Sequence, residues 1–156
     1  MSHVRIDIVP YDFARHGDGP KRVVIDAWIP YGYEFSEEFD TDIVRPDLAY
    51  PLGFVVGEQD GRVVGCIGIS DDGYGTYHLN RLYVRQDARR QGLGGRLVDW
   101  VIDEARRHGG TRLILFSDIA FEDAHRLYRS KGFRCTRFRY AADAWASREW
   151  GFEMEL

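Results

Sequence analysis

The sequence predicts an α/β (α+β) fold in which helices flank a mixed, mostly antiparallel central sheet. Three observations support this class. Apolar and polar residues alternate along several early segments, the apolar period becomes helical after Gly92, and strand and helix patterns then follow one another toward the C-terminus. With 156 residues the chain is long enough to bury one hydrophobic core. We therefore expect a single domain over residues 1–156.

Before residue 50 the secondary-structure pattern is weakest over residues 11–50. Alternation of apolar and charged residues predicts a first strand at residues 4–8. Pro20 is suited to the start of a helix, which we expect to continue through about Trp28. The tyrosine-rich, acidic segment 31–40 is expected to form a loop and a short helix.

A hairpin and a further strand are predicted next. Residues 53–58 and 62–70 are apolar runs separated by Asp60-Gly61, a pair that suits a tight hairpin turn. The turn sequence DDGYG then leads into a strand at residues 77–84.

The second half of the chain alternates helices with strands. Residues 93–105 place apolar side chains on one helical face, and His108-Gly109-Gly110 ends that helix. The later elements are expected in the order strand, helix, strand and strand, at residues 112–117, 121–132, 133–140 and 150–156.

Charge is distributed unevenly along the sequence. Residues 1–80 carry 6 basic and 14 acidic side chains, whereas residues 81–140 carry 14 basic and 7 acidic ones. This asymmetry favours an anionic ligand on the middle segment and a cationic one near the N-terminal segment. The basic residues form no continuous stripe, so we expect no nucleic-acid partner.

Other classes are excluded by simple patterns. The sequence has no apolar run long enough to span a membrane and no secretory leader pattern, so a cytoplasmic protein without a membrane partner is expected. Cys66 and Cys135 lie far apart without metal-ligand spacing, and we expect reduced thiols and no metal.

A glycine-rich turn preceded by arginines predicts an anion site. Gly92, Gly94 and Gly95 stand where the helix begins, and its first backbone amides have no partners within the helix. Glycines let an anion approach those amides, while Arg89 and Arg90 can add charged hydrogen bonds. The spacing matches neither a Walker A loop nor the dinucleotide fingerprint, so a pyrophosphate bound in another way is expected.

Two motifs resemble those of one enzyme superfamily. Arg89-x-x-Gly92-x-Gly94, which follows the strand sequence LYV, resembles the acetyl-CoA-binding motif of the GNAT N-acetyltransferases. The sequence AHRLYRSKGF at residues 124–133 is similar to the second motif of the same family. The resemblance covers residues 53–140 and is loose before residue 50. It implies the family fold, with about seven strands in a mixed, mostly antiparallel sheet.

The resemblance also implies how the donor acetyl-CoA binds, within a core at residues 77–133. The pyrophosphate would lie on the backbone of the glycine turn, and the pantetheine arm would run along the strand sequence LYV. An amide near Val84 would polarise the thioester carbonyl. Where relatives often carry asparagine, this chain has Phe121, so that contact with the cofactor is lost or changed. The expected cofactor-binding residues are Leu82, Tyr83, Val84, Arg89, Arg90, Gln91, Gly92, Leu93, Gly94 and Gly95.

Two residues are expected to act in catalysis. Tyr128 matches the family position whose hydroxyl faces the departing sulfur, which it would stabilise through a hydrogen bond. His78 stands where relatives often carry a glutamate base, and an imidazole can accept the proton of an amine near neutral pH. Other candidates for the base stay open, namely water, Asp118, Glu34, Glu37, Glu38 and His125, although His125 is expected to pack on its helix.

We therefore predict an acyl-CoA-dependent N-acyltransferase that moves acetyl to a primary amine of a small cationic molecule by direct attack in a ternary complex. The surroundings of Cys66 are too apolar to activate a thiol for a covalent route. Residues 11–50 and 140–149 are expected to form the acceptor side, with Tyr31, Tyr33 and Phe35 stacking on a cation. The alternatives are a protein or peptide amine acetyltransferase and a non-catalytic CoA-binding sensor. The acyl length stays open, and exposed edge strands would allow a homodimer.

Overall fold

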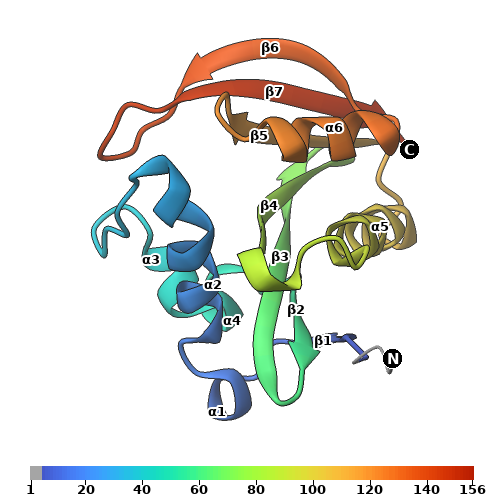
Figure 1. Ribbon diagram of the computed structural model, residues 1–156. Coiled ribbons are helices and arrows are strands. Elements are labelled where there is room, and N and C mark those ends of the chain that lie inside the picture. The colour runs from blue at the N-terminus through green and yellow to red at the C-terminus, as the bar shows by residue number, and fades with distance from the viewer. Residues whose placement is uncertain (1–4) are drawn as a thin grey trace.

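The computed structural model describes residues 5–156 and has a single sheet with helices on both faces (Figure 1). The sheet has seven strands in the order β1-β2-β3-β4-β5-β7-β6, as the fold class predicts. The strands are β1 (Asp7–Pro10), β2 (Gly53–Gln59), β3 (Arg62–Gly73), β4 (Thr76–Val84), β5 (Arg112–Asp118), β6 (Arg134–Tyr140) and β7 (Arg148–Glu155). The helices are α1 (Phe13–His16), α2 (Gly19–Trp28), η1 (Ile29–Tyr31), α3 (Thr41–Val44), α4 (Pro46–Ala49), η2 (Gln86–Ala88), α5 (Leu93–Arg107) and α6 (Glu122–Ser130).

The first strand lies further along the chain than the alternating pattern indicates. We predict a strand at residues 4–8, but β1 begins at Asp7, and Val4 lies outside the described residues. Asp7 pairs with Glu58, close to the end of β2, so residues before Asp7 would lie opposite the hairpin turn and have no partner strand. Ile6 is nevertheless buried beneath the sheet, which explains the apolar pattern.

The short helix predicted within residues 31–40 does not form there, because η1 ends at Tyr31 and the residues after it make a loop. The predicted position of this helix is therefore wrong. The short helices α3 and α4 come directly afterwards. The loop instead closes on itself, because the amide of Ser36 donates to the Asp40 carboxylate at 2.9 Å and the amide of Asp40 donates to the Ser36 carbonyl at 2.7 Å. Pro46 then begins α4, where a missing amide hydrogen costs nothing.

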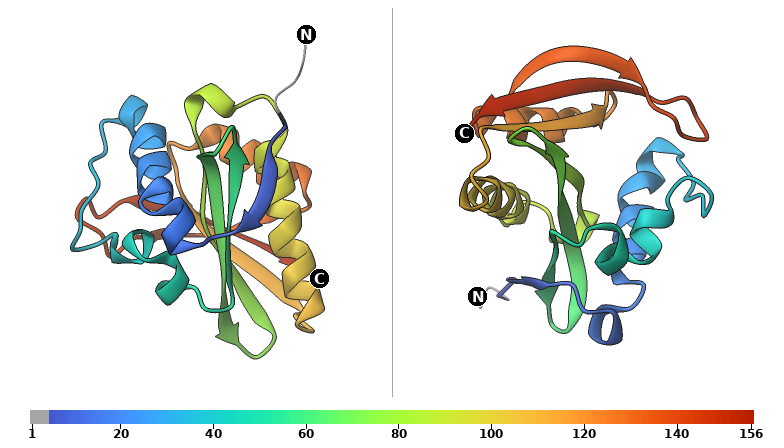
Figure 2. Two further views of the ribbon diagram at one scale, coloured as in Figure 1. Left: turned by 90° about the horizontal axis from the view of Figure 1, so that it is seen from below. Right: turned by 180° about the vertical axis from the view of Figure 1, so that it is seen from behind.

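The central hairpin is confirmed. Asp60 and Gly61 both adopt positive φ angles, 53° and 73°, which is the geometry of a tight type I′ turn between β2 and β3. The helix predicted from Pro20 is α2, and the helix predicted after Gly92 is α5. Figure 2 shows α2 on one face of the sheet and α5 on the other.

Strands β4 and β5 separate partway along their length. They are the one parallel pair among the described strands, and their pairing runs only from Thr76–Arg112 to His78–Ile114. Beyond that point β4 carries an irregularity opposite β3, where Arg81 adopts a positive φ of 55°. Such a bulge bends a strand and ends its pairing on one side. The C-terminal half of β4 therefore has an edge that β5 does not cover.

Two apolar clusters hold the helices to the sheet. One lies under α5 and α6 and contains Leu97, Val101 and Phe152; the other lies under α2 and contains Val23 and Val24. Full burial of apolar side chains of this size contributes about 1.5–3 kcal/mol each, which fixes the helices around the separated strands. In the described part of the chain no helix is long and apolar enough to cross a membrane.

Candidate active site

A cavity of about 270 Å³ opens where β4 leaves β5. The strand, the glycine turn and the first half of α6 surround it. All but one of the residues expected to bind the cofactor line this cavity. They are Leu82, Tyr83, Val84, Arg89, Arg90, Gly92, Leu93, Gly94 and Gly95.

The exception is Gln91, whose side chain does not line the cavity. Its amide oxygen accepts a hydrogen bond from Gln59 at 3.3 Å. The sequence motif covers Gln91 because the glycine turn is contiguous, but the backbone turns the side chain of this residue toward the β2–β3 hairpin.

The glycine turn presents backbone amides to the cavity. Gly92 is the N-cap of α5 with a left-handed φ of 75°, and the first amide to bond within the helix is that of Arg96, to the Gly92 carbonyl at 3.2 Å. The amides of Leu93, Gly94 and Gly95 precede it and have no helical partner. A Cβ built on Gly94 would lie 3.2 Å from the end of the Leu127 side chain, and one built on Gly92 would meet nothing within 4 Å, so the surface of the turn is open to a ligand.

The uncovered edge of β4 offers a second set of backbone groups. The amide of Arg85 donates to the Val64 carbonyl of β3 at 2.8 Å. Because successive residues of a strand turn their polar groups to opposite edges, Val84 points its amide and carbonyl toward the cavity. The Val84 carbonyl in turn accepts a hydrogen bond from Arg89 at 3.4 Å, which holds this arginine beside the cavity. The first cavity thus brings together arginine side chains, backbone amides that have no partner within the helix, and the edge of β4 that β5 does not cover.

A second cavity, of about 530 Å³, adjoins the first. Leu82, Tyr83, Phe121 and Ala124 line both cavities, so the two meet at the β4 bulge and the start of α6. His78 and Tyr128, the two expected catalytic residues, both line the second cavity. The segments 11–50 and 140–149 also contribute to it, among others through Trp28, Tyr33, Phe39, Asp40, Ala141, Asp143 and Trp145.

Tyr128 is 4% exposed and packs between Phe133 and Phe152, with ring centroids 5.8 and 5.6 Å away. Burial raises the pKa of its hydroxyl well above the usual range. A phenol of this kind is a poor source of free protons and a good hydrogen-bond donor. Tyr128 therefore packs as a core aromatic residue and also lines the second cavity.

His78 is oriented by an acidic residue. Its Nδ1 lies 3.2 Å from a carboxylate oxygen of Asp72, at the end of β3. With Nδ1 as the donor in this pair, the lone pair of a neutral imidazole is on Nε2, which is the arrangement of an oriented general base. Asp72 is absent from the sequence prediction, and its only signal is the turn DDGYG shortly before His78.

The other candidate bases divide into two groups. Asp118 is buried in the wall of the second cavity, where it accepts a hydrogen bond from the Ala120 amide at 2.8 Å. Burial first, and then the hydrogen bond to Asp118, raise the pKa of Tyr33 to about 12. Two sets of residues line neither cavity: Glu34, Glu37 and Glu38 on the N-terminal loop, and His125, which bonds to Ser117 at 3.1 Å.

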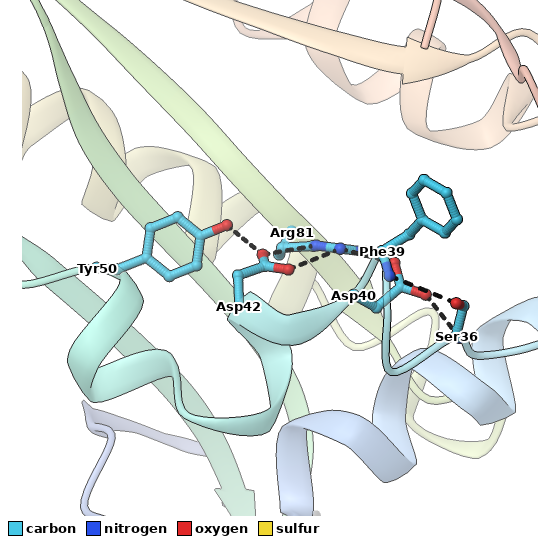
Figure 3. Close-up of polar contacts among 6 residues, drawn as sticks. All are labelled: Ser36, Phe39, Asp40, Asp42, Tyr50 and Arg81. Carbon is cyan, nitrogen blue, oxygen red and sulfur yellow. Dashed lines mark hydrogen bonds and ion pairs between the residues drawn. The ribbon is translucent and has the colours of Figure 1, made fainter. Parts of the chain in front are cut away.

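A largely buried ionic network at Arg81 is a second part of the site that sequence reasoning misses (Figure 3). Arg81 donates to both oxygens of Asp42 and to Asp40, each at 2.9 Å, and the Tyr50 hydroxyl donates to Asp42. Burial acts to raise the pKa of Asp42, but the hydrogen bonds and charge of Arg81 outweigh it and hold this pKa below its usual range. The network ties the acceptor-side segment to the β4 bulge and places Phe39 and Asp40 in the wall of the second cavity.

The second cavity is acidic and aromatic. Its wall contains four carboxylates, Asp40, Asp118, Asp143 and Glu149, against two arginines, Arg81 and Arg139. Both arginines are ion-paired, Arg139 with Glu149 at 2.9 Å. A cavity with this balance attracts cations.

Neither cysteine lines either of the two cavities. Cys66 is fully buried, and burial raises its pKa to about 12, which leaves it protonated. Cys135 is exposed on β6. Within residues 5–156, no group of three or more His, Cys, Asp or Glu side chains is arranged to hold a metal ion.

Comparisons with known proteins bear on the family and on the fold. A model of the acetyltransferase (GNAT) family matches residues 21–133. Over 112 residues the chain is 30% identical to the aminoalkylphosphonate N-acetyltransferase of Salmonella typhimurium, covering 68% of this chain and 70% of that protein. An acetyltransferase of the GNAT family from Staphylococcus aureus shares the fold with a TM-score of 0.85 at 16% identity, over 97% of this chain and 99% of that one. The structure of yncA from Salmonella typhimurium with its cofactor acetyl-CoA has a TM-score of 0.72 at 20% identity, over 97% and 94%.

Proposed function

The chain belongs to the GNAT family of acetyltransferases, which use acetyl-CoA as donor, and from this premise we propose that it acetylates a primary amine of a small cationic molecule. The reaction is a direct transfer in a ternary complex. The observation that carries the proposal is the junction of the two cavities, where the cofactor edge of β4 meets a wall containing His78 and Tyr128.

The donor fits the first cavity. The amides of Leu93, Gly94 and Gly95 receive the pyrophosphate at the positive end of α5, and Arg89 and Arg90 add positive charge. The pantetheine arm lies along the bare edge of β4, where it takes the place of a neighbouring strand. When bound, acetyl-CoA supplies an activated thioester at the cavity junction.

The first step is the removal of a proton from the acceptor. An alkyl ammonium with a pKa of about 10.4 needs about 4–5 kcal/mol to release its lone pair at neutral pH. Nε2 of His78 accepts that proton, and Asp72 holds the ring in the required tautomer. Asp118 is the second candidate for this step, because it shares the same cavity wall.

The second step exchanges the carbon–sulfur bond for a carbon–nitrogen bond. The free amine attacks the thioester carbonyl carbon, and the amide of Val84 stabilises the negative charge that develops on the carbonyl oxygen. The electron pair of the broken bond goes to sulfur, and the attacking nitrogen loses its second proton, which reaches that sulfur through solvent, so the products are a neutral amide and CoA with a free thiol. Tyr128 stabilises that sulfur with a hydrogen bond from its hydroxyl, and burial keeps this hydroxyl protonated.

The acceptor is assigned from the second cavity. Its four carboxylates exceed its two ion-paired arginines, and Trp28, Tyr33 and Trp145 supply aromatic faces for a cation. The Salmonella typhimurium relative named for aminoalkylphosphonate raises a second class, an amine that carries an anion. An anion would need an arginine without a carboxylate partner, and neither arginine of the cavity meets that condition.

The test is a panel of amines assayed by release of CoA thiol from acetyl-CoA. Diamines and amino sugars represent the cationic class, aminoalkylphosphonates the anionic class, and short peptides the protein acetyltransferase alternative. We expect turnover with the cationic class and a higher KM for the anionic class. Tight CoA binding without turnover on any amine would instead support a CoA sensor, and turnover confined to peptides would support a protein acetyltransferase.

A further inference from the structure

Asn80 lies on the same face of β4 as His78, two residues further along the strand. Exposure alternates there, because His78 and Asn80 are partly exposed while Tyr77 and Leu79 are buried. The alternation holds as far as Asn80, since the irregularity of β4 begins with Arg81. Side chains two residues apart on a strand leave the backbone about 7 Å from each other. Asn80 therefore neighbours the proposed base, and both residues line the second cavity.

Two hydrogen-bond acceptors fix the carboxamide of Asn80. Its Nδ2 donates to the Ser70 hydroxyl at 2.9 Å and to the His78 carbonyl at 3.0 Å. A carbonyl oxygen can only accept hydrogen bonds, so the amide nitrogen of Asn80, and not its oxygen, must face the His78 carbonyl. These two bonds use both N–H groups of the carboxamide. Oδ1 is therefore held on the side that faces away from them.

The Oδ1 atom of Asn80 is an acceptor open to a ligand. Within residues 5–156 both hydrogen bonds of this side chain are made by Nδ2, and Oδ1 accepts none. The atom is also not sealed in the interior, because the Trp28 indole N–H is the one fully buried side-chain polar atom without a partner in the described part of the chain. Since Asn80 belongs to the wall of the second cavity, its Oδ1 can receive a hydrogen bond from a molecule bound there.

We propose that Asn80 binds the acceptor directly, with Oδ1 accepting a hydrogen bond from the reacting ammonium group while another proton of that group goes to Nε2 of His78. The inference rests on the proposed function and names the group that recognises the nucleophile. Oδ1 keeps its hydrogen bond to the nitrogen before and after His78 removes the proton, because the neutral amine still has two N–H bonds. The amine is thus held beside the cofactor edge of β4 throughout the transfer.

The contact distinguishes amines from alcohols. An ammonium group has three N–H bonds and can satisfy both Oδ1 of Asn80 and Nε2 of His78, whereas a hydroxyl group has a single O–H. A hydroxyl that donates to His78 would leave Oδ1 desolvated and without a partner, which weakens binding. A site that needs two hydrogen bonds from one group therefore selects nitrogen nucleophiles.

The test separates the role of Oδ1 from that of Nδ2. Asn80→Leu has a similar size without polar atoms, and it should raise the KM for diaminobutane about tenfold while the KM for acetyl-CoA stays unchanged. Asn80→Ala, which adds no bulk, should behave in the same way. Asn80→Asp keeps an oxygen acceptor but loses both Nδ2 bonds, and its KM for diaminobutane should stay within about threefold of wild type. Equal losses in Asn80→Asp and Asn80→Leu would overturn the proposal, because Asn80 would then act only through its bonds to Ser70 and His78.

Binding provides a readout separate from turnover. Calorimetric titration of diaminobutane into the complex with CoA measures acceptor binding without reaction. We expect Asn80→Leu to bind the amine about tenfold more weakly than wild type and to bind CoA equally well. Unchanged affinity for diaminobutane in Asn80→Leu, with thermal unfolding showing an intact fold, would also overturn the proposal.

The matched control is Thr76→Val. Thr76 lies on the same face of β4, but its hydroxyl accepts a hydrogen bond from Arg112 at 3.3 Å and it lines neither cavity. This variant should keep the affinities for diaminobutane and for CoA. Failure of the proposed function would be seen differently, as binding of both ligands to wild type without release of thiol, and the titration would still measure the Asn80 contact. Absence of amine binding to wild type would overturn both proposals.

Discussion

A negative charge placed at Gly94 tests the anion site, because its effects on folding and on binding have opposite signs. Gly94 is the second residue of α5, and the helix begins there without acidic residues in its first turn. An aspartate at this position interacts favourably with the helix dipole, by about 0.3–1 kcal/mol, and replaces a flexible glycine. Its Cβ would meet only the end of the Leu127 side chain, at 3.2 Å, which can move aside. We therefore expect Gly94→Asp to fold with unchanged or slightly higher stability.

Binding of CoA should fall sharply in the same variant. The new carboxylate would stand about 6 Å from a diphosphate seated on the turn, a distance set by one side-chain length. With an effective dielectric constant of about 40, each phosphate charge then costs about 1.4 kcal/mol. Two charges give about 3 kcal/mol, or a loss of affinity of about 100-fold.

Calorimetric titration with CoA measures the affinity, and thermal unfolding measures the stability. Gly94→Asn is the matched control, since it has the same shape without the charge, and it should lose no more than about tenfold. The loss in Gly94→Asp should shrink as salt is added. Unchanged CoA affinity in Gly94→Asp, with the fold intact, would refute the assignment of the glycine turn as the pyrophosphate site.

Three further outcomes follow from the same structure. His78→Ala should lower the rate about 100-fold at neutral pH and approach wild type near pH 9.5, where the acceptor loses its proton unaided; a constant ratio in the pH–rate profiles of the two proteins would remove His78 from the role of base. Arg81→Met should destabilise the protein by up to about 3–5 kcal/mol in urea unfolding, because it leaves the buried Asp40 and the partly buried Asp42 without their cation, and adding Asp42→Asn should recover part of that loss. Burial lowers the pKa of His125 below 6.5, so the folded state disfavours the charged ring and stability should be lost as pH falls below about 6.5. The urea midpoint of His125→Gln should therefore fall less between pH 7 and pH 5 than that of wild type, and equal slopes would contradict this origin.

Secondary structure could be predicted from the sequence wherever neighbouring residues alone determine the backbone conformation. The Asp60-Gly61 turn needs two positive φ angles, and the change of period after Gly92 follows directly from helix geometry. The failures lie before residue 50. There β1 is defined by its pairing with β2, α3 by its contacts with α2 and α4, and α4 by its contact with β2, so no local pattern marks their ends.

The site divides in the same way. The glycine turn is contiguous in sequence, and a motif could therefore find nearly all of it. Asp72 and the network of Arg81 depend on contacts between distant segments, with Asp40 and Asp42 about 40 residues before Arg81 in the chain. Arg81 also lies within a predicted strand, where nothing local indicates that a bulge turns it into a buried ion pair.

Phe121 departs from the family pattern and lies between the donor and acceptor cavities. The resemblance implies an asparagine at this position, so we expect the polar contact with the cofactor to be lost or changed in this chain. The centroid of the Phe121 ring instead lies 4.9 Å from that of Tyr31 and 6.3 Å from that of Tyr33, and both tyrosines belong to the acceptor-side segment. Phe121 also lines both cavities. An apolar contact across the junction would exclude water from the reacting groups once both substrates are bound, which would strengthen each hydrogen bond made there. We therefore expect donor binding to depend on how the acceptor-side segment is held, and the Arg81 network holds part of this segment.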